Sequence, residues 1–164
     1  MAGGKREIAT LVMTRKILFL DIDGVCNSLE YAQRNGMNLW NKTDPELNKL
    51  VHRIIKETGC KVVLSSTWRL YPEAKAVVRR KVCDFIDCTV DMQRGGKWGV
   101  ADRGLEVQEW LDRHPSVTEY AILDDNSDFL PHQWLFKTTF EKGLTPEIAQ
   151  AVIHHLNAKD NIVL

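Results

Sequence analysis

The stretch KILFLDIDGV, residues 16–25, decides the fold of this chain. Its apolar run is too short for a helix and is followed by Asp and Gly, which predicts a buried β-strand over residues 16–22. In extended backbone, residues i and i+2 point to one side, so we expect the carboxylates of Asp21 and Asp23 to lie together, with Cα atoms about 6.6 Å apart. Gly24 allows a sharp turn and leaves backbone N–H groups open to an anion. The structural alternative is a strand that ends in an Asx turn.

Length, composition and charge are those of an ordinary globular domain. The 164 residues fit one domain with an adequate core, and 44% of them are hydrophobic. The 22 basic residues balance the 22 acidic ones, which weighs against a dedicated nucleic-acid binder but leaves room for a local basic patch. No apolar run approaches the roughly 18 residues of a membrane span, and the N-terminus lacks a secretory signal. We therefore expect a cytoplasmic protein with no membrane partner.

The cysteines and the N-terminal residues add two expectations. Cys26, Cys60, Cys83 and Cys88 show no metal-ligand spacing, which predicts free thiols in a reducing compartment and no zinc site. Met13 stands three residues before the first strand and is a candidate start. Residues 1–12 are then a leader or an artificial extension without order, and residues 13–164 form a single domain.

Predicted strands and helices alternate along the chain. We expect strands at residues 16–22, 60–64, 85–90, 119–123 and 136–140, and helices at 45–58, 72–84, 104–113 and 146–156. This order predicts an α/β fold of three layers, Rossmann-like, with a mainly parallel sheet of about five strands. Ligands bind beyond the carboxyl ends of such strands, where Asp21, Ser65 and Asp124 would meet. Residues 25–42 contain the longest stretch without a predicted element, which is typical of a functional or mobile loop.

Four motifs, in order, resemble those of the haloacid dehalogenase-like (HAD) phosphohydrolase superfamily. The first is the apolar strand with its Asp-x-Asp-Gly sequence, and the second is an apolar strand that ends in Ser. The third is a basic residue at a helix start, and the fourth is an acidic strand end. The residues that carry them are Asp21 to Gly24; Ser65; Arg103, with Lys97 as a competitor; and Asp124-Asp125, with Asp128 at the spacing of an Asp-x-x-x-Asp variant.

The resemblance implies a phosphatase and a catalytic role for several of these residues. Asp21 would attack phosphorus and form an aspartyl phosphate, and Asp23 would act as general acid and base. Ser65, with Ser66 as its rival, would hydrogen-bond a phosphoryl oxygen, and Arg103 would offset the developing charge.

The resemblance also implies Mg²⁺, which prefers oxygen ligands. Its ligands would be Asp21, the backbone carbonyl of Asp23, Asp124 and either Asp125 or Asp128.

The positions where larger relatives carry a cap domain are short here. Residues 25–42 and 68–102 leave no room for one, so we expect an open site without a large cap. Relatives of this kind often act on macromolecular phosphates or close the site by oligomerising. Together with Gly143-Leu144-Thr145, the string Ser65-Ser66-Thr67-Trp68-Arg69 resembles the HAD domain of Swiss-army-knife RNA repair proteins.

This narrower resemblance favours a phosphomonoester hydrolase acting on nucleotides or nucleic-acid ends. Trp68 and Arg69 would stack on and pair with a nucleotide, with Gly24, Ser66 and Lys97 as further substrate contacts. Local packing of Trp68 is the alternative, and His132 and Trp134 either rim the site or pack elsewhere. Arg79-Arg80-Lys81 is expected to be an exposed helix face.

Two other functions stay open from the sequence. One is a small-metabolite phosphatase or phosphotransferase whose site is covered by another subunit, and the other is a non-catalytic phosphate-binding module. The oligomeric state is not determined by the sequence.

Overall fold

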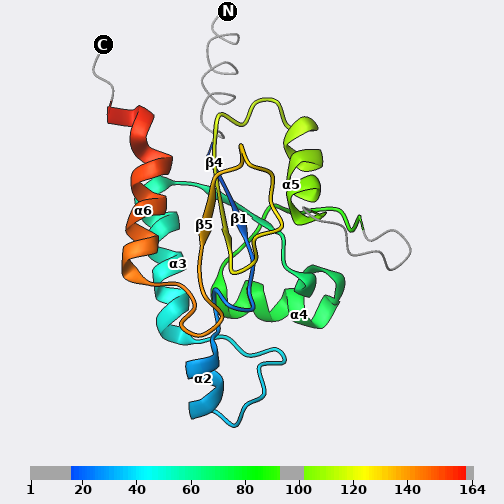
Figure 1. The fold of residues 1–164 in the computed structure, drawn as a ribbon, viewed down its shortest axis with the longest axis vertical. Helices are drawn as coiled ribbons and strands as arrows, with labels where there is room; N and C mark the ends of the chain where they lie inside the picture. The colour runs from blue at the N-terminus through cyan, green and yellow to red at the C-terminus, as the bar shows by residue number, and fades with distance from the viewer. Residues whose placement is uncertain (1–15, 93–101, 162–164) are drawn as a thin grey trace, which may run out of the picture.

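Five parallel strands form one sheet in the order β3-β2-β1-β4-β5 (Figure 1). The computed structural model describes residues 16–92 and 102–161. The predictions for Lys97 and for residues 1–12 concern residues outside these described ranges. The strands are β1 (Lys16–Leu20), β2 (Lys61–Leu64), β3 (Asp87–Cys88), β4 (Glu119–Asp124) and β5 (Leu135–Lys137). The predicted α/β fold with a parallel sheet is therefore confirmed.

Side-chain caps mark the start of α2 (Leu29–Arg34), α3 (Pro45–Thr58) and α6 (Pro146–Asn157). Helix α3 starts where the side chain of Asp44 accepts from the Glu46 N–H, and it ends at Gly59, whose φ is +70°. The remaining helical elements are η1 (Thr67–Leu70), α4 (Pro72–Val77), η2 (Val78–Val82), α5 (Asp102–Asp112) and η3 (Ala158–Asn161). Within the described ranges, no helix is long and apolar enough to cross a bilayer.

Alternation along β1 separates the core into two layers. Leu18 and Leu20 pack with α3, α4 and α6 on one face of the sheet. Ile17 and Phe19 pack on the other face with Trp110 of α5, whose ring meets Phe19 edge-on at 5.5 Å. Figure 1 shows α3 and α6 side by side, with α5 across the sheet from them. These layers leave the carboxyl ends of the strands open, as expected of this architecture.

Three local predictions need correction. Residues 25–42 contain the helix α2, which is too short to display a periodic pattern and is capped by Ser28. The predicted helix at 72–84 divides into α4 and the π-helical turn η2. The predicted strand at 85–90 is only two residues long, because β3 is an edge strand with one neighbour.

Candidate active site

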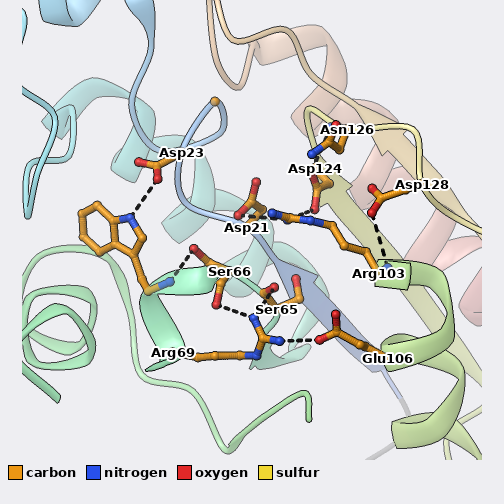
Figure 2. A network of polar contacts seen from close by, with 12 residues as sticks. Asp21, Asp23, Ser65, Ser66, Arg69, Arg103, Glu106, Asp124, Asn126 and Asp128 are labelled. Carbon is orange, nitrogen blue, oxygen red and sulfur yellow. Dashed lines mark hydrogen bonds and ion pairs between the residues drawn. The ribbon is translucent and has the colours of Figure 1, made fainter. Parts of the chain in front are cut away.

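Three of the predicted site residues lie where neighbouring strands end. Asp21 follows β1, Ser65 follows β2, and Asp124 is the last residue of β4 (Figure 2). The ladder continues one step past β1, since the N–H of Asp21 donates to the Leu123 carbonyl at 3.0 Å and that of Ser65 to the Leu20 carbonyl at 3.0 Å. The parallel register therefore brings these side chains to one edge of the sheet.

A cluster of three carboxylates occupies this edge. Asp21, Asp124 and Asp125 each offer an oxygen that lies within 4.8 Å of the other two. Asp21 is 3% exposed and Asp124 is fully buried. Burial, followed by the charge of Asp124, raises the pKa of Asp21 well above its ordinary value, and the same two causes raise the pKa of Asp125.

The side chain of Arg103 enters the carboxylate cluster from the start of α5. Its guanidinium donates to Asp124 Oδ2 at 2.7 Å and lies 3.5 Å from Asp21 Oδ1 (Figure 2). Burial disfavours this cation, but Asp21 and Asp124 outweigh it and raise the guanidinium pKa. Within residues 16–92 and 102–161, one cation lies beside three carboxylates, which leaves this part of the cluster short of positive charge. The cluster therefore fits a hard divalent cation such as Mg²⁺, which prefers carboxylate oxygens.

The two candidates for the last metal ligand have different positions. Asp125 belongs to the carboxylate cluster, whereas Asp128 lies beside the first residues of α5. The carbonyl of Asp128 accepts from the Gly104 N–H at 2.9 Å, and its Oδ2 lies 3.4 Å from the Arg103 nitrogen. Asp128 thus orients the helix that carries Arg103, and Asp125 is the one of the two whose carboxylate lies where it could hold a cation together with Asp21 and Asp124.

Gly24 is necessary for the position of Asp125. Its φ is +78°, and a Cβ at this position would lie 2.3 Å from Asp125 Oδ2. The expectation that backbone N–H groups of this turn are open to an anion fails for Gly24 itself, whose N–H donates to Asn27 Oδ1 at 3.0 Å, and stays a prediction for its neighbours. The Gly24 carbonyl accepts from Thr138 Oγ1 at 2.5 Å, which joins this turn to the segment after β5.

Asp23 lies apart from the carboxylate cluster. The Trp68 indole N–H donates to its Oδ2 at 3.0 Å (Figure 2). The Asn27 amide donates to Asp23 Oδ1 at 2.8 Å. The expectation that Asp21 and Asp23 point to one side is wrong, because β1 ends at Leu20 and a turn begins at Ile22. The backbone carbonyl of Asp23 stays a predicted metal ligand.

The two serines after β2 have different hydrogen-bond partners. Ser66 Oγ accepts from the Trp68 N–H at 3.1 Å and so caps η1. Ser65 Oγ is buried and has no hydrogen-bond partner among the described residues. Since a buried hydroxyl without a partner is costly, Ser65 is the one suited to meet a phosphoryl oxygen.

The predicted nucleotide contacts of Trp68 and Arg69 do not agree with their positions. Trp68 is 4% exposed and packs in the core, which leaves no ring face for a base. Arg69 is 8% exposed, and all five guanidinium N–H groups are matched by acceptors. These acceptors are the carbonyls of Ser65, Ser66, Thr89 and Val90 and the carboxylate of Glu106.

Arg69 and Glu106 instead join the Ser65 loop to α5. Glu106 belongs to the helix that begins beside Arg103, so this buried pair connects two of the predicted catalytic residues. Burial raises the pKa of Glu106 to about 7, although the charge of Arg69 acts in the opposite direction.

The sequence analysis did not single out Asn27, which donates a hydrogen bond to Asp23, or the aromatic pair Trp40 and Tyr71. Asn27 is fully buried and donates also to the Lys42 carbonyl at 3.1 Å; a polar residue within the run Val25-Cys26-Asn27 was the available signal. Trp40 and Tyr71 form an exposed edge-to-face pair, with ring centroids 5.5 Å apart, on the two segments that follow Asp23 and Trp68.

The remaining candidates are placed away from the site. His132 contacts Gln108 of α5, and Trp134 packs on His155 of α6, so neither rims it. The four cysteines are free thiols, as expected.

Comparison with known proteins agrees with this arrangement. No curated protein and no solved structure matches the chain significantly. One family does match, over residues 17–149, which include all of the carboxylate cluster, Ser65 and Arg103. This match covers more than half of the chain, and the family supports a phosphatase-type hydrolase in general terms. The chain therefore belongs to the family described as the HAD domain in Swiss Army Knife RNA repair proteins.

Proposed function

We propose that this protein is a magnesium-dependent phosphomonoesterase that acts through an aspartyl phosphate. The observation that carries the proposal is the carboxylate cluster, in which buried Asp21 lies beside Arg103 and the described residues supply fewer cations than carboxylates. The unpartnered hydroxyl of Ser65 at the same edge supports it, since a phosphoryl oxygen would supply the missing partner.

Asp21 is the nucleophile of the proposed reaction. One of its carboxylate oxygens forms a bond to phosphorus while the bond from phosphorus to the leaving oxygen breaks. Arg103 and the Ser65 hydroxyl stabilise the charge on the transferred group. Asp21, Asp124 and Asp125 would hold Mg²⁺, which supplies positive charge for the phosphoryl oxygens.

Asp23 moves the proton in both halves of the reaction. It donates a proton to the leaving oxygen and then takes one from the water that attacks the aspartyl phosphate, which restores Asp21. Trp68 and Asn27 position this carboxyl group, because each donates a hydrogen bond to one of its oxygens. Neither contacts the reacting atoms in this scheme.

The proposed substrate is the terminal phosphate of a nucleic acid, in the cytoplasm. The description of the matching family, which refers to RNA repair, supports this substrate class. The absence of a folded cap from the described residues also supports it, because residues 25–42 hold only the six-residue helix α2. A small phosphorylated metabolite is the alternative.

Turnover of 3′- and 5′-phosphorylated oligonucleotides, mononucleotides and sugar phosphates should be measured with and without Mg²⁺. We expect magnesium-dependent release of phosphate, fastest from an oligonucleotide end, and its loss in Asp21→Asn. The control Asp112→Asn changes an exposed carboxylate whose partner among the described residues is Gln108. Turnover that survives in Asp21→Asn would exclude the proposed nucleophile, and faster turnover of the sugar phosphates would exclude the proposed substrate.

A further inference from the structure

Two adjoining pockets along α3 form a groove lined by basic side chains. Their volumes are about 740 and 600 Å³, and they share His52 and Lys81. Seven lysines and arginines line the two pockets, against one acidic residue, Asp84. The whole chain has equal numbers of basic and acidic residues, so this is a local concentration of positive charge. We refer to these two pockets together as the α3 groove.

Most of the positive charge in the α3 groove is free to bind a ligand. Lys56, Lys61, Arg80 and Lys81 are exposed, and none makes an ion pair within the described part of the chain. The one acidic residue does little to neutralise them. Asp84 lies 3.9 Å from Arg79, and its side chain is 96% exposed.

The walls of the α3 groove are held together by hydrogen bonds between α3 and η2. The Asn48 amide donates to the Lys81 carbonyl at 3.1 Å, and the His52 ring contacts the Val82 carbonyl. Arg79 is fixed over the Phe85 ring, 3.7 Å from its centroid. The basic side chains therefore extend from a rigid frame, which reduces the entropy lost when they bind an extended anion.

The α3 groove begins near the predicted leaving-group side of the site. Lys42 lines one end, and its carbonyl accepts from Asn27, which also holds Asp23. Helix α3 then runs about 21 Å to the opposite edge of the sheet, where Lys61 begins β2. A ligand that leaves the site past Asp23 would meet this row of cations.

We propose that the α3 groove binds the phosphodiester backbone of a single-stranded nucleic acid whose terminal phosphate lies in the active site. This inference rests on the proposed function and extends it from a phosphate ester to a polymer several nucleotides long. A concave row of unpaired cations matches a chain of regularly spaced phosphates. A flat anionic membrane would contact only its rim.

Binding should be measured in the Asp21→Asn background, where turnover does not consume the probe. The probes are a fluorescent 3′-phosphorylated 12-nucleotide RNA, the same sequence as DNA, a nucleoside 3′-phosphate and anionic vesicles. The groove variant is Lys56→Gln/Lys61→Gln. The matched control, Arg113→Gln/Lys159→Gln, removes two charges from other surfaces, where the side chains pair with Glu109 and Glu119.

We expect the groove variant to bind the oligonucleotide about tenfold more weakly or worse, and to lower the slope of log K against log salt by about 1.4. The nucleoside 3′-phosphate and the control variant should show no such change. The RNA and DNA arms identify which polymer binds. Equal oligonucleotide affinity in the groove and control variants overturns the inference, as does binding of vesicles alone.

Turnover of a small aryl phosphate by Lys56→Gln/Lys61→Gln in the native Asp21 background separates this inference from the proposed function. Unchanged turnover with unchanged oligonucleotide binding would overturn only the α3 groove. Loss of oligonucleotide binding in the groove variant, in a protein that hydrolyses none of the phosphate esters, would support the groove and overturn the proposed reaction.

Discussion

The two aspartates on either side of Ile22 have opposite surroundings. Asp21 lies in the carboxylate cluster, where Arg103 is the one cation that the described residues place beside three acids. Asp23 has no place in the cluster, and a hydrogen bond is donated to each of its two oxygens by neutral side chains. One region is therefore left short of positive charge for a ligand, whereas the other is already satisfied and pre-organised. This difference matches the proposed division between nucleophile and proton carrier.

The largest predicted effect distinguishes Asp21 from Asp23 by how far each substitution depends on the leaving group of the substrate. Asp21→Asn should lower kcat about 10⁴-fold or more on every substrate, because no bond to phosphorus forms without it. Asp23→Asn should lower kcat/KM, which reports the first half of the reaction, about 10²–10⁴-fold on an alkyl phosphate, whose leaving oxygen needs a proton, and far less on an aryl phosphate. Parallel assays of both variants on both esters measure the difference. Equal losses on both esters by Asp23→Asn would contradict its role as general acid.

The next effect tests the contact between Gly24 and the carboxylate cluster. Gly24→Ala should lower the free energy of unfolding by about 2–4 kcal/mol and weaken magnesium binding, because positive φ strains alanine and the new Cβ would displace Asp125. The control Gly36→Ala has a φ of +88° and no atom within 4 Å of its Cβ. Chemical denaturation and magnesium titration of both variants check this. Equal losses in the two variants would mean that backbone strain alone is responsible.

A smaller effect tests the position of Asp23. Trp68→Phe removes one hydrogen bond to this carboxyl group and should lower kcat on an alkyl phosphate about tenfold, with KM unchanged and the pH profile of kcat displaced. The control is Trp110→Phe, because the Trp110 indole N–H donates to Asp87 at 2.8 Å, away from the site. Both variants lose a similar, partly buried hydrogen bond, so only Trp68→Phe should alter the profile. Matching profiles would leave Trp68 a purely structural role.

The smallest effect is the pH dependence of stability that comes from Glu106, the buried partner of Arg69. Burial raises the pKa of Glu106 to about 7 from an unfolded value of 4.5, so the folded protein binds the extra proton between these values. The stability that wild type has over Glu106→Gln is thus complete below pH 4.5 and declines, by about 1–2 kcal/mol, as pH rises through 7. Denaturation of both proteins between pH 4.5 and 8 measures it. A difference that grows with rising pH would show that the ion pair with Arg69 outweighs burial.

The fold was largely predictable because alternating apolar runs and capped helices demand a parallel sheet. Thr145 and Pro146 mark the start of α6, and Asp44 and Pro45 that of α3, through local capping that needs no distant partner. Helix α2 was not predicted, since six residues with one buried side chain carry no periodic signal.

The site was predictable where a residue ends or follows a strand, or begins a helix as Arg103 does. Strand ends predict the place of Asp21, Ser65 and Asp124, because the parallel register brings the carboxyl ends of their strands to one edge of the sheet. The contacts of Trp68 and Arg69 were not predictable, since their partners Asp23 and Glu106 are 45 and 37 residues away in the chain. Pairing over such distances depends on how η1 packs against the sheet and α5.

The sequence by itself determined the parallel sheet, the edge at which the carboxylates gather and the family resemblance. Only the tertiary structure decided that Asp125 rather than Asp128 joins the carboxylate cluster, and that Trp68 holds Asp23 instead of binding a base. The physical reason is range. Strand periodicity and helix caps act over a few residues, whereas the partner of a buried polar group is set by the packing of elements distant in the chain.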